Sequence, residues 1–194
     1  MNRSFAFVMV VGIAACRSNN GTPEEVRPPV QSAVERGQYL VTVGGCNDCH
    51  TPFKLGPNGP EPDMTRMLSG HPAELVMPPA PAPTGPWLVA SAGTNTAHAG
   101  PWGVSFTANL TPDQDTGIGA WSVETFMATI RNGRHMGAGR PLNPPMPWFN
   151  YAKMTDEDLR AVYAYLRTIP AIANKVPEPI APPSAPTAML GGGA

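Results

Sequence analysis

Residues 46–50 of this 194-residue chain have the sequence Cys46-Asn47-Asp48-Cys49-His50. Two thiols three positions apart can each form a thioether with a vinyl group of haem, and the imidazole of the next residue is then placed to bind the iron. The pattern therefore predicts a covalent haem c site made by Cys46, Cys49 and His50. It occurs once in the sequence, so we expect one haem and one iron.

Two other kinds of site use closely spaced cysteines. A thioredoxin-like redox site needs a βαβ context, whereas the residues before Cys46 have a helical pattern. A structural zinc site needs four ligands, but after residue 50 the sequence offers only His71, His98 and His135 and no second cysteine pair. Each of these histidines lies near glycine or proline in an expected loop, where an exposed or hydrogen-bonded imidazole is commoner than a ligand.

The N-terminus has the pattern of a secretory signal. Residues 1–3 give a positive start, and residues 5–15 are apolar but shorter than the roughly 20 residues that span a bilayer. Residues 13–16, Ile-Ala-Ala-Cys, then resemble a bacterial lipobox. We expect cleavage before Cys16, a lipid on Cys16, and a periplasmic protein anchored to a membrane through that lipid. The alternative is an ordinary secretory signal that leaves Cys16 as a free thiol.

Proline and glycine account for 25 and 20 residues and are concentrated in particular segments. After a signal peptide at 1–15, residues 16–30 fit a polar tether, and residues 177–194 fit a Pro/Ala/Gly-rich tail. Residues 76–86 form a Pro-rich insert that cannot be regular helix or central strand. The remaining residues, 31–176, suffice for one domain with a core. A net charge of −1 with dispersed basic residues gives no indication of nucleic-acid binding.

Three segments carry apolar residues at helical spacing, with capping residues at their ends. The expected helices run from Val30 to the Gly44-Gly45 pair, from the N-cap Ser122 to Gly133, and from the N-cap Thr155 to Pro170. The first helix leads directly into the haem motif.

Long alternating patterns typical of strands are absent from the sequence, although residues 87–90 and 103–108 can form short extended pieces. We therefore predict an all-α fold with long Pro/Gly-rich loops. In such a domain the haem, an apolar plate, supplies much of the surface that the helices bury.

Three stretches carry a resemblance to a known family: Gly37-Gln38-Tyr39-Leu40 with residues 46–51, Asn109-Leu110-Thr111-Pro112-Asp113 with residues 116–121, and Met146-Pro147-Trp148 running into residues 151–166. They resemble class I c-type cytochromes, in particular single-domain relatives of the cytochrome c subunits of bacterial alcohol and gluconate dehydrogenases. The resemblance implies a class I cytochrome c fold, in which the N- and C-terminal helices cross near the haem edge. It also implies that the sixth iron ligand comes from a loop before the last helix.

That ligand is expected among the methionines. Five are explained otherwise, because they follow the haem motif too closely for the class I arrangement or pack in and beside helices: Met64, Met67, Met77, Met127 and Met154. Met136 and Met146 remain. Met146 lies in Pro144-Pro145-Met146-Pro147-Trp148, whose fixed φ angles and few backbone donors suit the rigid presentation of one sulfur atom. The class I arrangement agrees, so we predict Met146, with Met136 as the alternative.

Trp121 is a further candidate for haem contact. Its indole N–H can donate to a haem propionate, as a tryptophan does in similar cytochromes, or the residue can serve as a plain core anchor. Both interpretations predict that Trp121 is buried.

The predicted function is one-electron transfer between redox partner proteins. A His50 and Met146 pair fills both axial positions of the iron and leaves no open position for a substrate, so we do not expect an enzyme. One alternative is a haem-bearing subunit of a membrane dehydrogenase or oxidase complex, for which tryptophans exposed on the surface would argue (Trp87, Trp102 and Trp148). A haem peroxidase or gas sensor, the other alternative, requires an open sixth position.

Overall fold

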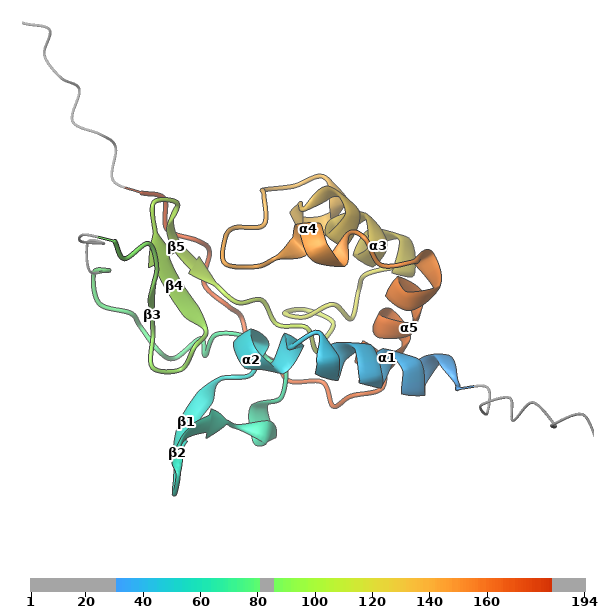
Figure 1. Ribbon diagram of the computed structural model, residues 1–194, viewed down its shortest axis with the longest axis horizontal. Helices are drawn as coiled ribbons and strands as arrows, with labels where there is room; N and C mark the ends of the chain where they lie inside the picture. Colours follow the sequence, from blue (N-terminus) through green and yellow to red (C-terminus); the bar gives the residue numbers. More distant parts are fainter. Residues whose placement is uncertain (1–30, 81–85, 183–194) are drawn as a thin grey trace, which may run out of the picture. The chain divides into compact units, whose positions relative to one another are not determined.

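The computed structural model describes residues 31–80 and 86–182, in which helices near both ends lie against each other (Figure 1). α1 (Ala33–Val43) begins with a capping box, in which Ser32 Oγ accepts from the Glu35 N–H and the Glu35 carboxylate accepts from the Ser32 N–H. α5 (Asp156–Leu166) begins at Thr155, whose hydroxyl accepts from the Asp158 N–H at 3.0 Å. These short-range signals fix where both helices start.

The close contact of α1 with α5 depends on Gly37. A Cβ atom added at Gly37 would lie 1.9 Å from the Ala161 carbonyl oxygen, so only glycine permits this approach. Arg36 Nε also donates to the Asp158 carboxylate at 2.9 Å across the same contact. The two helices can therefore cross closely because Gly37 has no side chain, and one ion pair connects them.

The other helices are short. They are α2 (Cys46–His50), α3 (Val123–Asn132) and α4 (Trp148–Tyr151), with single 3₁₀ turns η1 (Met64–Arg66) and η2 (His135–Gly137). α3 begins at Ser122 and ends at Gly133, which has a left-handed φ of 61°. The three helices predicted from the sequence are thus confirmed, including the caps Ser122 and Thr155.

The prediction of an all-α fold is wrong, because the chain also forms two antiparallel sheets. β1 (Phe53–Gly56) pairs with β2 (Gly59–Pro62). β4 (Ala97–Gly100) lies between β3 (Ala90–Ser91) and β5 (Gly103–Phe106). The fold is therefore mixed, with helices and small sheets gathered at different ends in Figure 1.

The strands were missed for a physical reason. Each has four residues or fewer, too few to show an alternating pattern. The β1–β2 hairpin turns through Pro57 and Asn58, and β4 contains two alanines and a glycine, residues with weak strand preference. Their pairing comes from tertiary contacts, which a local pattern does not contain.

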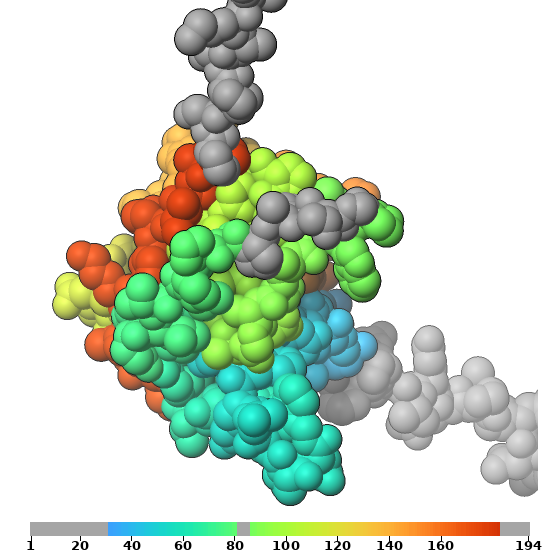
Figure 2. All heavy atoms as spheres, turned by 90° about the vertical axis from the view of Figure 1, so that its left-hand side faces the viewer, coloured from blue at the N-terminus to red at the C-terminus, as the bar shows by residue number. Residues whose placement is uncertain are grey.

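The segment after α5 returns along the domain. Ile180 pairs with Val104 of β5 through two backbone hydrogen bonds of 2.8 and 2.9 Å, and Figure 2 shows this red segment beside the light-green strand. Earlier in the segment, the Asn174 amide donates to the Ser69 and His71 carbonyls at 2.7 and 2.8 Å. The bonds of Asn174 join the end of the domain to the loop that follows the haem motif, and those of Ile180 join it to β5.

Several predictions concern other parts of the chain. The signal peptide at 1–15, the tether at 16–30 with Cys16, and residues 183–194 of the expected tail lie outside the described residues, as do residues 81–85 of the Pro-rich insert. Among the residues that are described, no helix has both the length and the apolar character needed to cross a bilayer.

Candidate functional site

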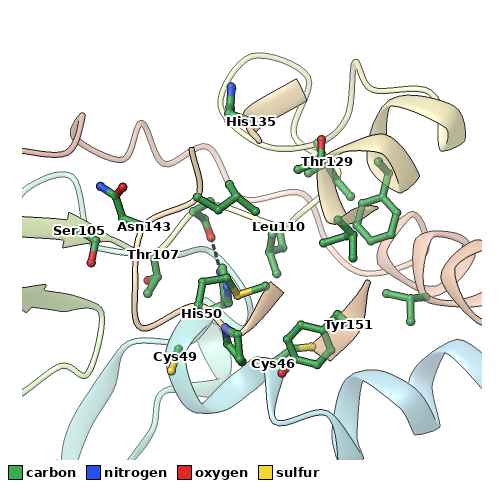
Figure 3. Close-up of a pocket in the computed structure, with 18 of the residues that line it drawn as sticks. Cys46, Cys49, His50, Ser105, Thr107, Leu110, Thr129, His135, Asn143 and Tyr151 are labelled. Carbon is green, nitrogen blue, oxygen red and sulfur yellow. Dashed lines mark hydrogen bonds between the residues drawn. The ribbon is translucent and has the colours of Figure 1, made fainter. Parts of the chain in front are cut away.

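The three residues of the haem motif lie on α2 and line one cavity (Figure 3). α2 starts from Gly45, whose left-handed φ of 66° turns the chain sharply after α1. Behind α2, the Leu68 N–H donates to Thr51 Oγ1 at 2.9 Å and the Gly70 N–H donates to the His50 carbonyl at 2.8 Å. The short helix is thereby held in place from its C-terminal side.

His50 is buried, and its tautomer is set by one hydrogen bond. Its Nδ1 atom lies 2.8 Å from the Ala108 carbonyl oxygen, which can only accept, so Nδ1 carries the hydrogen. The Nε2 lone pair is then free to bind a metal. Burial lowers the pKa of His50 below its ordinary value of 6.5, which favours the neutral ring that ligation requires.

The pKa values of the two thiols are shifted in the opposite direction from those of a reactive cysteine pair. Burial raises the pKa of Cys46 from 9.0 to about 11, and the Asp48 carboxylate adds to this effect. Burial also raises the pKa of Cys49, again with a contribution from Asp48. A thioredoxin-like or nucleophilic cysteine needs a lowered pKa, so this environment argues against both kinds of site.

The cavity beside these residues has a volume of about 190 Å³ and is partly open to solvent. Its apolar wall comes mainly from α1, α3, α5 and the loop before α3: Leu40, Leu110, Ile118, Phe126, Ile130, Leu159, Val162 and Leu166. The apolar wall and the donor set of two thiols and one neutral imidazole fit a haem.

Two methionines line the same cavity, Met146 and Met154. The Met146 loop is fixed to β5, because Ser105 Oγ donates to the Pro144 carbonyl at 2.6 Å. Met136 is absent from the described cavity lining, and its side chain is 56% exposed. The structure thus brings Met146 and His50 to one cavity and leaves Met136 outside. It adds Met154, which the sequence assigned to helix packing.

Trp121 also lines the cavity, but it is only partly buried, contrary to expectation. Its ring meets the edge of the His135 ring at a centroid distance of 5.4 Å. The Tyr163 hydroxyl donates to the Trp121 carbonyl at 2.6 Å and so attaches this residue to α5.

The remaining histidines have different roles. His71 is fully buried and lies outside the described cavity lining, with Nδ1 2.9 Å from Thr96 Oγ1 and Nε2 3.0 Å from the Leu75 carbonyl. His98 and His135 both line the cavity. The sequence suggests loop positions for all three histidines. His98 in fact lies in β4 and is only 3% exposed. Burial lowers its pKa, with a smaller opposing effect from the Asn95 carbonyl.

Sequence reasoning also missed Tyr151 on α4. Its ring lines the cavity (Figure 3). Its hydroxyl donates to the carbonyl of Gly44, which lies shortly before the haem motif, at 2.6 Å. Nothing in the local sequence signals this contact, because the two residues are 107 positions apart.

Comparison with known proteins agrees with this site. The family model described as Cytochrome c matches residues 34–170. The chain is 31% identical over 132 residues to the gluconate 2-dehydrogenase cytochrome c subunit of Pantoea cypripedii, covering 68% of this chain and 22% of the relative. It is 28% identical over 147 residues to the fructose dehydrogenase cytochrome subunit of Gluconobacter japonicus, covering 76% and 23% respectively.

A third relative is the diheme cytochrome c-type protein of Cereibacter sphaeroides, which is 25% identical over 182 residues. That match covers 92% of this chain and 51% of the relative. The chain therefore spans less than a quarter of the length of the two dehydrogenase subunits and about half of the diheme protein.

Proposed function

The chain belongs to the cytochrome c family, and from this premise we propose that it passes single electrons between redox proteins through one haem c. In this proposal Cys46 and Cys49 form the thioethers, and His50 and Met146 bind the iron. The observation that supports it most strongly is the convergence of two thiols, a neutral buried imidazole and a methionine on one apolar cavity. A bound haem would supply an iron that accepts or gives up one electron.

The residues of the chain account for the rest of the proposed role. The Ala108 carbonyl holds His50 in the tautomer that exposes Nε2. A methionine sulfur is a soft ligand that favours the reduced metal, and the apolar wall limits access of water. If His50 and Met146 both bind the iron, they would leave no position on it for a substrate, and we therefore propose a carrier without catalytic activity of its own.

A haem-bearing subunit of a dehydrogenase complex is the second candidate, since two of the relatives are named as such subunits. Of the three tryptophans that could mark a docking surface, Trp87 is 74% exposed, whereas Trp102 and Trp148 are partly buried. Gel filtration of the native membrane fraction after solubilisation in mild detergent separates the two candidates. A carrier elutes as a single chain, and a subunit elutes with a larger assembly.

We propose that the protein is periplasmic and held at a membrane by a lipid on Cys16. The mature wild-type chain should then begin at Cys16 and sediment with membranes, because two or three acyl chains each contribute about 0.8 kcal/mol for every buried CH₂ group. The variant Cys16→Ser should stay unprocessed or become soluble. Mass spectrometry of the mature N-terminus checks this, and an unmodified N-terminus beyond Cys16 contradicts it.

The sixth ligand is tested by comparing three alanine variants. Met146→Ala should lose the weak long-wavelength charge-transfer band of sulfur-ligated ferric haem, bind carbon monoxide in the ferrous state, and show a lower midpoint potential. Met154→Ala, a matched control in the same cavity, and Met136→Ala should keep the band.

Loss of the band in Met154→Ala or Met136→Ala, with retention in Met146→Ala, would move the ligand to that residue. Wild-type protein that binds carbon monoxide readily would contradict the carrier proposal itself and favour a sensor or peroxidase.

A further inference from the structure

Three buried side-chain atoms lack a hydrogen-bond partner within the described part of the chain: Ser69 Oγ, His98 Nε2 and Thr107 Oγ1. His98 and Thr107 line the cavity, and Ser69 is outside its described lining. A buried polar group without a partner costs roughly 1–3 kcal/mol, so such groups call for a physical explanation. Two of these atoms belong to residues that line one cavity, which suggests a polar group on its ligand.

The β-sheet places these residues on one face. His98 in β4 pairs directly with Ser105 in β5, and Thr107 follows Ser105 by two positions. The Thr107 N–H continues the pairing by donating to the Thr96 carbonyl at 2.9 Å. Residues two apart on a strand share a face, so His98, Ser105 and Thr107 form a polar strip along the sheet. Figure 3 shows Ser105 and Thr107 on the same side of the cavity.

Ser91 gives His98 Nδ1 a hydrogen-bond partner that can donate or accept. Its Oγ atom lies 2.9 Å from His98 Nδ1. When the Ser91 hydroxyl donates to Nδ1, the neutral ring carries its hydrogen on Nε2, which is then a donor at the cavity. The Thr107 hydroxyl can donate beside it. Two donors without acceptors match a carboxylate, which when ionised only accepts.

We propose that His98 and Thr107 bind a carboxylate of the haem, with Ser91 as the positioning residue. This inference rests on the proposed function, since thioethers at Cys46 and Cys49 hold the vinyl edge of the macrocycle. The two propionates project from the opposite edge and require polar partners on an element other than α2. The polar strip on β4 and β5 can supply them, in a cavity whose lining from α1, α3 and α5 is mainly apolar.

The test uses full-length protein carrying haem with ¹³C-labelled propionates. Reduced-minus-oxidised infrared spectra report the carboxylate stretching bands, and a redox titration reports the midpoint potential. His98→Leu and the nearly isosteric Thr107→Val should each shift the labelled bands and lower the potential, because the carboxylate charge is then less compensated. His98→Gln keeps an N–H donor and should lie closer to wild type.

Ser69→Ala is the matched control, because it removes a buried unpaired hydroxyl outside the described cavity lining and should change neither band nor potential. Labelled bands that stay at the wild-type positions in both His98→Leu and Thr107→Val would overturn the inference. If His98→Leu does not accumulate, Thr107→Val alone decides in the same way. Wild-type protein without covalent haem would instead refute the proposed function.

Discussion

Single hydrogen bonds separate histidines that look alike in the sequence. The role of His50 follows from its position after two cysteines, but its tautomer depends on Ala108, which lies 58 residues away. His71 and His98 were both expected in loops. His71 has two hydrogen-bond partners, whereas His98 Nε2 has none among the described residues. Motif spacing predicts ligands, whereas hydrogen-bond partners distant in the sequence can be known only from the fold.

His71 should make stability depend on pH. Burial lowers its pKa below the ordinary value of 6.5, an effect to which Arg66 adds and which the Leu75 carbonyl and Glu74 oppose. The unfolded chain therefore binds a proton in a range where the folded chain does not. The free energy of unfolding should be greatest above about pH 6.5 and should fall as the pH drops below that value.

Guanidinium unfolding at pH 7.5 and pH 5.5 measures this loss, and the variant His71→Gln should lose less stability between the two conditions than wild type. The paired carboxylates have pKa values lowered from ordinary values near 4, for example Asp63 and Asp113, so they titrate below this window. Equal pH dependence in the variant and wild type would rule out a contribution from His71.

Whole elements were predictable where short-range signals were strong. α3 and α5 begin at Ser122 and Thr155, as their capping residues indicate, and α3 ends at Gly133. The short strands of both sheets escaped prediction because their pairing is imposed by neighbouring segments. The error matters for the site, since β4 and β5 contribute His98 and Ser105 to the lining of the cavity.

The contact between α1 and α5 gives a prediction at this scale. Gly37→Ala should destabilise the protein, because the new Cβ would lie 1.9 Å from the Ala161 carbonyl and force the helices apart. Alanine gains about 1 kcal/mol of helix propensity over glycine, but overpacking against backbone costs about 1–3 kcal/mol or more. The clash should therefore exceed the gain, giving a lower midpoint in thermal unfolding.

Gly93→Ala is the control for this experiment, because no atom lies within 4 Å of the added Cβ at that position. A Gly37→Ala protein that is as stable as the Gly93→Ala protein would show that the helices can separate without cost.

For the whole molecule, the sequence predicts a haem site but not the enclosure around it. The motif at 46–50 and the segment around Met146 are local patterns from which attachment residues and a ligand can be predicted. The bonds from Tyr151 to Gly44 and from Ile180 to Val104 join segments far apart in the chain, and neither has a local signal. In the folded chain, both contacts lie at or beside residues that line the cavity, such as Tyr151 and Pro179.

The central claim is that this cavity holds one haem through Cys46 and Cys49. Intact mass measurement of the denatured full-length protein, together with a haem stain on a denaturing gel, tests it most directly. We predict that wild type carries the added mass of one haem and that the double variant Cys46→Ala, Cys49→Ala carries none. Haem that is released from denatured wild type, haem that persists in the double variant, or more than one haem per chain would contradict the account.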